Sequence, residues 1–247
     1  MVKETEKRRG ANSKLLPFNF NLLQISVDNI EQKYKIIPVE SVVPKFNLNY
    51  QLKKKWQIAL AESIPLFSHN FQFRYTIFAV ILEKTFFCFE KKKLNYYVLK
   101  LPNFPKNIQE MITIRCWLEH LFNCAFEYAY FDRIVFNPEL INLLFDNDKT
   151  IPPQFNIQKP FLSLYNNTFE YIFKFVSNHL AISESVSINF SENSITEQNV
   201  NILLNILTNE GDKFPQFCLK SDNCFRLIRL YDFIVQVNIN YNLQNYW

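Results

Sequence analysis

The sequence predicts an α/β fold, in which an irregular leucine-rich-repeat-like βα array forms a parallel sheet and a small antiparallel β meander precedes it. Beyond residue 99, strand-like stretches recur at irregular intervals of roughly 20 to 35 residues. Helical stripes of apolar residues separate most of these stretches. Only two of the 247 residues are glycine. This argues against the alternative of a doubly wound sheet, because such folds commonly contain glycine-rich phosphate turns.

The stretch 185–219 is the clearest unit of the predicted array. Apolar and polar residues alternate over 186–190, as in a half-buried strand. A capping box at 194–197 then begins a helix, and Gly211 provides its end. Alternation resumes over 217–219. This unit has an apolar stripe that it cannot bury alone, so it needs neighbours of the same kind.

The same two periodicities predict the other elements. Stripes at helical spacing predict helices over 52–60, 107–128, 138–145, 169–180 and 228–235. Alternation predicts the meander strands over 71–77, 86–89 and 96–101, and later strands over 134–136, 155–157 and 237–243.

The expected organisation has three parts. Residues 1–50 are expected to be a poorly ordered or irregular segment, and residues 51–105 to form a helix plus the antiparallel meander. Residues 106–247 are expected to form the repeat-like recognition region. A content of 48% hydrophobic and 17% aromatic residues is enough for a packed core, so residues 51–247 are expected to form one domain.

The composition also indicates the cellular compartment of the protein and the classes of partner to expect. The five cysteines are an odd number without paired short spacing, which is typical of a reducing compartment. No apolar run approaches the about 20 residues of a membrane helix. We therefore expect an intracellular protein, cytoplasmic or nuclear, without a membrane partner. The net charge of +4 is spread over distant basic runs with no nucleic-acid-reading motif, so no nucleic-acid partner is expected.

No catalytic motif is found in the sequence, so we expect no enzyme, no catalytic residue and no cofactor. The strongest candidate for a metal site is the set Cys116, His120 and Cys124, which are spaced four residues apart. On a helix the two cysteines would lie about 12 Å apart along the axis, too far to share one ion. A solvated helix face is the preferred interpretation, and no metal site is predicted. The acidic cluster at 146–148 has too few ligands for calcium and is interpreted as a polar turn.

Alternation also predicts which residues point away from the core. If apolar strand residues pack against the helices, the opposite sheet face carries polar side chains and is a candidate docking surface for a protein partner. An ordinary wet surface, or a face covered by the amino-terminal meander, is the alternative. The candidate partner-binding residues are Lys100, Arg133, Gln154, Asn156, Ser187, Asn189 and Gln216.

Distinctive strings occur at 115–123, 136–141, 144–152, 187–190 and 205–211. They resemble strings of the nematode-expanded F-box-associated proteins, and the similarity covers most of the chain from about Gln51 to Ile234. In that family an F-box helix bundle docks on the Skp adaptor of a cullin ubiquitin ligase, and the downstream repeats choose the substrate. Here Leu16-Pro17 is only a trace of the leucine-proline that opens an F-box, so residues 1–50 hold a degenerate F-box at most.

The resemblance implies a non-enzymatic protein-recognition module, like the substrate-receptor part of an F-box protein, with a substrate protein and possibly the Skp adaptor as partners. The alternative is a stand-alone structural or effector-like protein-binding protein with no ligase connection. The least favoured of the three functions is that of a hydrolase or transferase whose acidic catalytic residues match no known motif.

Overall fold

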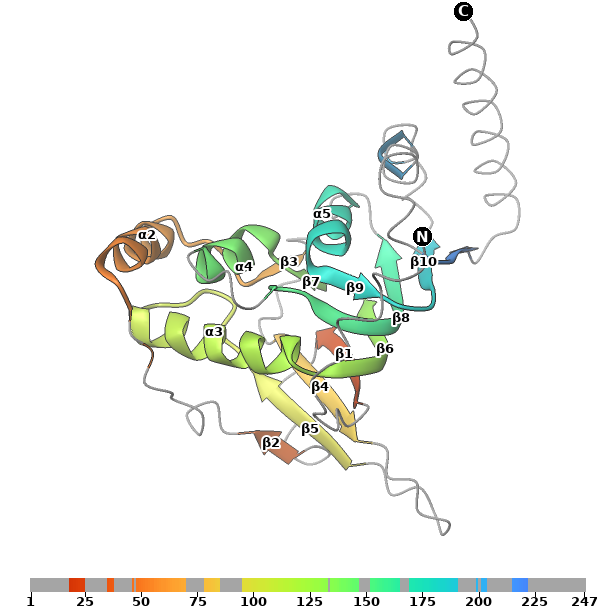
Figure 1. Cartoon of the computed structure of the whole chain (residues 1–247), viewed down its shortest axis with the longest axis horizontal. Helices are drawn as coiled ribbons and strands as arrows, with labels where there is room; N and C mark the ends of the chain where they lie inside the picture. The colour runs from red at the N-terminus through yellow and green to blue at the C-terminus, as the bar shows by residue number, and fades with distance from the viewer. Residues whose placement is uncertain are drawn as a thin grey trace, which may run out of the picture.

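Strands and helices are interleaved along the chain, which confirms the predicted α/β class (Figure 1). The computed structural model describes residues 18–24, 35–37, 46, 48–69, 78–84, 95–132, 134–146, 152–164, 169–190, 199, 201–203 and 215–221.

The described strands form one large, mostly parallel sheet and one small antiparallel sheet. The large sheet has nine strands in the order β11-β10-β8-β6-β1-β4-β5-β2, with β9 paired to β8. Along this order only β4 runs against its neighbours; all other pairings are parallel. The strands are β1 (Phe18–Gln24), β2 (Lys35–Ile37), β4 (Phe78–Lys84), β5 (Asn95–Lys100), β6 (Ala125–Asp132), β8 (Phe155–Leu164), β9 (Leu180–Ile182), β10 (Val186–Phe190) and β11 (Phe217–Ser221).

The small sheet pairs β3 (Phe67–His69) with β7 (Ile134–Phe136) in antiparallel fashion. The strand over 134–136 was therefore predicted correctly, but its place in the parallel array was wrong. Asn137 explains the pairing, because its backbone amide donates to the Leu66 carbonyl at 2.8 Å and its side chain donates to the Pro65 carbonyl at 2.9 Å. In the large sheet, β6 pairs with β8 instead.

Four helices have described bounds, and three of them begin at a capping asparagine. The side chains of Asn49, Asn107 and Asn137 accept hydrogen bonds from amides in the first turns of α2, α3 and α4. The predicted helices over 52–60, 138–145 and 169–180 are confirmed. The bounds are α2 (Tyr50–Ala61), α3 (Ile108–Phe122), α4 (Pro138–Phe145) and α5 (Phe169–His179).

The predicted helix over 107–128 was wrong in its second half. Helix α3 ends at Phe122, and Asn123 follows it with both its backbone amide and its side chain donating to the Glu119 carbonyl. Strand β6 begins two residues later, at Ala125. Apolar residues of β6 happen to continue the helical spacing of α3, so periodicity alone hid the boundary.

Two described stretches of the amino-terminal segment, 18–24 and 35–37, form strands of the sheet, whereas residues 1–50 were expected to be poorly ordered or irregular. Strand β1 lies between β4 and β6, antiparallel to the first and parallel to the second. The brief alternation of Phe18, Phe20 and Leu22 is the sequence signal for this strand. Several other predictions lie outside the described residues: the strands over 71–77, 86–89 and 237–243, the capping box at 194–197, Gly211 and the helix over 228–235.

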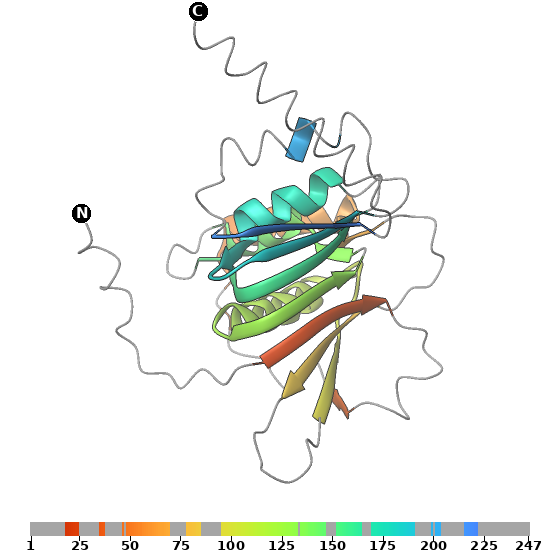
Figure 2. The same cartoon turned by 90° about the vertical axis from the view of Figure 1, so that its right-hand side faces the viewer.

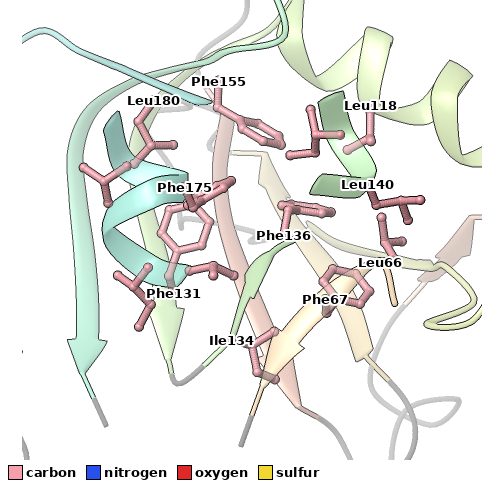
Figure 3. Packing of buried hydrophobic residues seen from close by; sticks show 14 of the residues in the cluster. Leu66, Phe67, Leu118, Phe131, Ile134, Phe136, Leu140, Phe155, Phe175 and Leu180 are labelled. Carbon is pink, nitrogen blue, oxygen red and sulfur yellow. The ribbon is translucent and has the colours of Figure 1, made fainter. Parts of the chain in front are cut away.

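A cluster of phenylalanine rings joins the helices to the sheet (Figure 3). Phe155 of β8 is fully buried, and its ring centroid lies 4.8 Å from that of Phe122 in α3. It also lies 5.2 Å from Phe136 in β7 and 5.9 Å from Phe175 in α5. One side chain therefore packs α3, β7 and α5 against the same face of the sheet.

A buried arginine joins α3 to α4. Arg115 is 3% exposed, and its guanidinium lies between the Phe46 and Phe145 rings, at 4.5 Å and 4.4 Å from their centroids. It donates to the carbonyl of Leu144 in the last turn of α4. Trp56 of α2 donates to the neighbouring carbonyl, of Leu143, at 3.1 Å. Side chains of two other helices thus satisfy carbonyls that the end of α4 leaves without intrahelical partners.

Histidine is buried at the end of α5. His179 is 1% exposed, and its Nδ1 lies 2.8 Å from the carbonyl oxygen of Pro153, so Nδ1 carries the hydrogen of that bond. Burial lowers the pKa of His179, while the carbonyls of Pro153 and Pro138 oppose this shift. The imidazole is therefore held in its neutral form within the core.

Replacing Phe155 by alanine should destabilise the fold strongly. Loss of a fully buried ring leaves a cavity among three aromatic neighbours, and we expect the free energy of unfolding to fall by about 3–5 kcal/mol. Urea denaturation monitored by circular dichroism measures this change. The matched control is Phe104→Ala, because Phe104 is 45% exposed and should cost about 0.5 kcal/mol or less. Similar losses for the two variants would contradict the packing.

Arg115→Lys should also lower the free energy of unfolding, by about 2 kcal/mol. Lysine keeps the positive charge but lacks the planar group that stacks between Phe46 and Phe145. Lys174→Arg on the exposed surface of α5 is the control. A loss at Arg115 no greater than at Lys174, measured by urea denaturation, would show that stacking contributes nothing.

Acidification should destabilise the fold through His179. Its folded-state pKa lies below the ordinary value of 6.5, so the unfolded chain takes up a proton first as the pH falls. The free energy of unfolding should therefore decrease below about pH 6.5 and continue to decrease until the folded-state pKa is reached. Thermal unfolding of wild type and His179→Gln, between about pH 7.5 and about pH 5, measures this contribution.

The pH dependence should be shallower in His179→Gln than in the wild type. His120→Gln is the control, because His120 is exposed on α3. Equal slopes for the wild type and His179→Gln would rule out a contribution of this histidine.

Candidate functional site

The candidate site is the outer face of the large sheet, opposite α3 and α5. Figure 2 looks onto the strands, with α3 behind them. In β10, Val186, Ile188 and Phe190 are buried, while Ser187 and Asn189 between them are partly exposed. Because successive strand residues point to opposite faces, these two polar side chains lie on the outer face.

Pairing between strands places aromatic residues beside Ser187. In the sheet register Phe161 of β8 is the partner of Ser187, and Tyr130 of β6 is the partner of Phe161. The two ring centroids are 5.7 Å apart in a tilted arrangement. Tyr130 is 44% exposed, so part of its ring contacts solvent. On β11, Lys220 is the register partner of Asn189.

Strands β6 and β8 share an irregularity beneath this face. Their buried residues are spaced by three positions at one point, from Phe126 to Ala129 and from Ile157 to Pro160, where a regular strand would have a spacing of two. Each strand therefore contains one extra residue, and because Phe126 pairs with Ile157 and Ala129 with Pro160, the two extra residues lie beside each other in the sheet. Beyond that point the outward positions are shifted by one residue, which brings Tyr128 and Lys159 side by side.

The irregularity continues into the next strand. The backbone amides of Glu184 and Ser185 both donate to the carbonyl of Gln158, at 3.2 Å and 3.1 Å. Two residues thus oppose one, as in a β-bulge, and β9 and β10 lie on either side of it. Bulges redirect side chains, and this one brings Glu184 to Lys159.

Lys159 is held by two contacts across the bulge. Its ammonium lies 2.9 Å from a carboxylate oxygen of Glu184 and 5.3 Å from the centroid of the Tyr128 ring. The hydrogen bond to Glu184 raises the pKa of Lys159, and burial opposes this only in part. The lysine is therefore charged at neutral pH, and Glu184 balances its charge.

Lys220 has no carboxylate partner among the residues that the structure describes. Its ammonium lies 5.6 Å from the centroid of the Phe161 ring, which is a cation–π distance, and the residue is exposed. We call the surface formed by these side chains the outer-face patch. It consists of Tyr128, Tyr130, Lys159, Phe161, Ser187, Asn189 and Lys220.

Of the seven predicted partner-binding residues, Ser187 and Asn189 lie in this patch. Gln154 and Asn156 lie at the start of β8, where their side chains donate to the carbonyls of Asn178 at the end of α5 and Phe122 at the end of α3. These two residues connect helix ends to the sheet.

The other three predicted residues lie elsewhere. Gln216 is exposed just before β11, and its carbonyl accepts from the Val186 amide at 2.9 Å. Lys100 ends β5, which β6, β1 and β4 separate from β8. Arg133 lies outside the described residues.

Sequence reasoning missed the aromatic and basic part of the patch. It assigned Tyr128 to a helix and ended the strand of β8 at residue 157, before Lys159 and Phe161. Lys220 could have been found, because Phe217 and Leu219 alternate with it. No periodic signal marks the other residues, because the bulge interrupts the alternation.

Of the three residues expected on a solvated helix face, Cys116 is buried in α3, Cys124 is half-buried beyond the end of α3, and His120 is exposed. Cys116 is 3% exposed, and burial, followed by the nearby Glu119 charge, raises its pKa to about 11. Burial also raises the pKa of Cys124, whose Sγ donates to the His120 carbonyl at 3.3 Å. Helix α3 packs on both sides, so a residue away from the sheet is buried as well. Both thiols are protonated at neutral pH.

The described part of the chain contains neither a metal-binding cluster nor a membrane-spanning helix. There, no three side chains among histidine, cysteine, aspartate and glutamate gather in a way that could hold a metal ion. None of the helices traced in those ranges has the length and apolar character needed to cross a bilayer.

Comparison with known proteins corrects the resemblance inferred from the sequence. The family model that matches is DUF8381, a domain of unknown function, over residues 37–191; no F-box or F-box-associated family matches. The F-box-associated assignment was therefore wrong: short strings of common helix and strand residues suggested a kinship that a whole-domain comparison does not support. No curated protein and no solved structure matches the chain. Because the matched model covers more than half of the 247 residues, the chain belongs to the DUF8381 family.

Proposed function

We propose that this chain is a non-enzymatic protein-recognition module that binds a partner protein on the outer face of its sheet. The observation that carries the proposal is the alternation of β10, which buries Val186, Ile188 and Phe190 and leaves Ser187 and Asn189 on that face. The expected ligase connection rested on the F-box-associated resemblance and forms no part of the proposal.

The composition of the patch suits protein binding. Tyrosine and other aromatic residues are enriched at protein interfaces, since they combine a large apolar area with few rotatable bonds. Tyr130 and Phe161 supply such area, and Ser187 and Asn189 supply neighbouring hydrogen-bonding groups. A mixture of apolar and polar groups is typical of interfaces between proteins that also exist separately.

The rigidity of the scaffold also favours recognition. The patch residues come from β6, β8, β10 and β11, which are paired with one another by continuous registers. Phe155 and its neighbours pack the opposite face against two helices. Side chains fixed in this way lose little conformational entropy when a partner binds.

The double variant Ser187→Arg/Asn189→Arg should abolish partner capture without unfolding the chain. Two long charged side chains would obstruct the face, while the buried residues of β10 remain unchanged. Proximity labelling in the cells that express the protein, followed by mass spectrometry, measures capture. The control is Gln51→Arg/Gln57→Arg, which places the same two charges on the exposed side of α2.

We expect a set of proteins labelled by the wild type and by the α2 control but at least about tenfold less by the outer-face variant. Thermal unfolding should be the same for all three within a few degrees. Unchanged labelling by the outer-face variant would exclude this face as the docking surface.

A further inference from the structure

We infer that the outer-face patch binds an extended acidic segment of the partner protein. This inference rests on the proposed function and adds the chemistry of the partner. It comes from the placement of the two lysines relative to the aromatic rings and to Glu184.

The patch holds two ammonium groups, and Glu184 pairs with one of them. Glu184 balances the charge of Lys159 through their 2.9 Å contact. Lys220 adds a second ammonium group, and the described residues hold no carboxylate partner for it. Its ammonium lies 5.6 Å from the centroid of the Phe161 ring, which orients the ammonium without neutralising its charge. A carboxylate of the partner could therefore form an ion pair with Lys220.

The same contacts disfavour single-stranded nucleic acid as the partner. Binding of that kind stacks bases on free aromatic faces. Here Lys220 covers a face of Phe161, and Lys159 covers a face of Tyr128, at 5.6 Å and 5.3 Å. Of the three rings of the patch, Tyr130 is 44% exposed, while Tyr128 and Phe161 are half-buried. A peptide needs no stacking surface, because its aliphatic side chains can contact ring edges.

The layout suits an extended segment whose side chains on one face are acidic and apolar in turn, because successive residues of an extended chain point to opposite faces. Carboxylates would meet the ammonium groups of the two lysines, while apolar side chains would contact Tyr130 and Phe161 between them. Ser187 and Asn189 would provide hydrogen bonds to the backbone of the segment. Charge complementarity of this kind sets specificity and orientation more than affinity.

The test uses a fluorescein-labelled peptide of about 12 residues in which every second residue is glutamate or valine in turn and the residues between them are serine, long enough to extend over about 40 Å. Fluorescence polarisation with the full chain measures its dissociation constant. A peptide with lysine in place of glutamate is the first control. We expect the glutamate peptide to bind, the lysine peptide not to bind, and added salt to weaken the binding.

Lys220→Glu should weaken binding of the glutamate peptide at least about tenfold. The matched control is Lys54→Glu, which makes the same charge change on the exposed surface of α2. Equal weakening by the two variants would show attraction by net charge alone and would overturn the inference. No binding of the glutamate peptide to the wild type would overturn it as well.

A single-stranded oligothymidine of about 20 nucleotides separates the two classes of partner. If it binds and Lys220→Glu abolishes that binding, the partner class is nucleic acid, and both the inference and the proposed function are wrong. If neither probe binds while Ser187→Arg/Asn189→Arg still loses its labelled proteins in cells, the proposed function stands and only the acidic chemistry is wrong.

Discussion

Burial of the Phe155 ring is the constraint on which the rest of the structure depends. Its contacts with Phe122, Phe136 and Phe175 pack α3, β7 and α5 against one face of the sheet. Since side chains alternate along a strand, fixing this inner face also fixes the outer one. The polar and aromatic side chains of the outer-face patch point outward for that reason. The core therefore determines the candidate site without containing any part of it.

Strong local periodicity allowed much of the fold to be predicted. Helices α2, α4 and α5 have clear stripes, and the alternation of β10 is regular from Val186 to Phe190. The failures have physical causes. The sequence pattern places β6 in the same helix as α3. The reason is that the buried positions of β6 are three residues apart between Phe126 and Ala129, which is a helical spacing. Strand β1 has a readable alternation, but its partners β4 and β6 are distant in sequence, and no local pattern identifies such partners.

The candidate site was predictable only in part. Ser187 and Asn189 could be placed because β10 is regular. Lys159 and Phe161 could not, because they follow a bulge in β8 and flank Pro160, a residue that argues against a central strand. The meeting of Lys159 with Glu184 depends on a bulge that spans neighbouring strands, which one sequence does not reveal. The outer-face patch therefore required the three-dimensional registers of β6, β8, β10 and β11.

We propose that a partner protein covers the outer face of the sheet in the cell. Cys218 of β11 reports on this face directly, because it is partly exposed and is the register partner of Ser187. Cys124, at the end of α3, provides an internal reference away from the patch. The measurement is the ratio of N-ethylmaleimide alkylation at Cys218 to that at Cys124, in intact expressing cells and in the purified chain. If a partner covers this face, the ratio should be several-fold lower in cells; the same ratio in cells and in the purified chain would contradict such coverage.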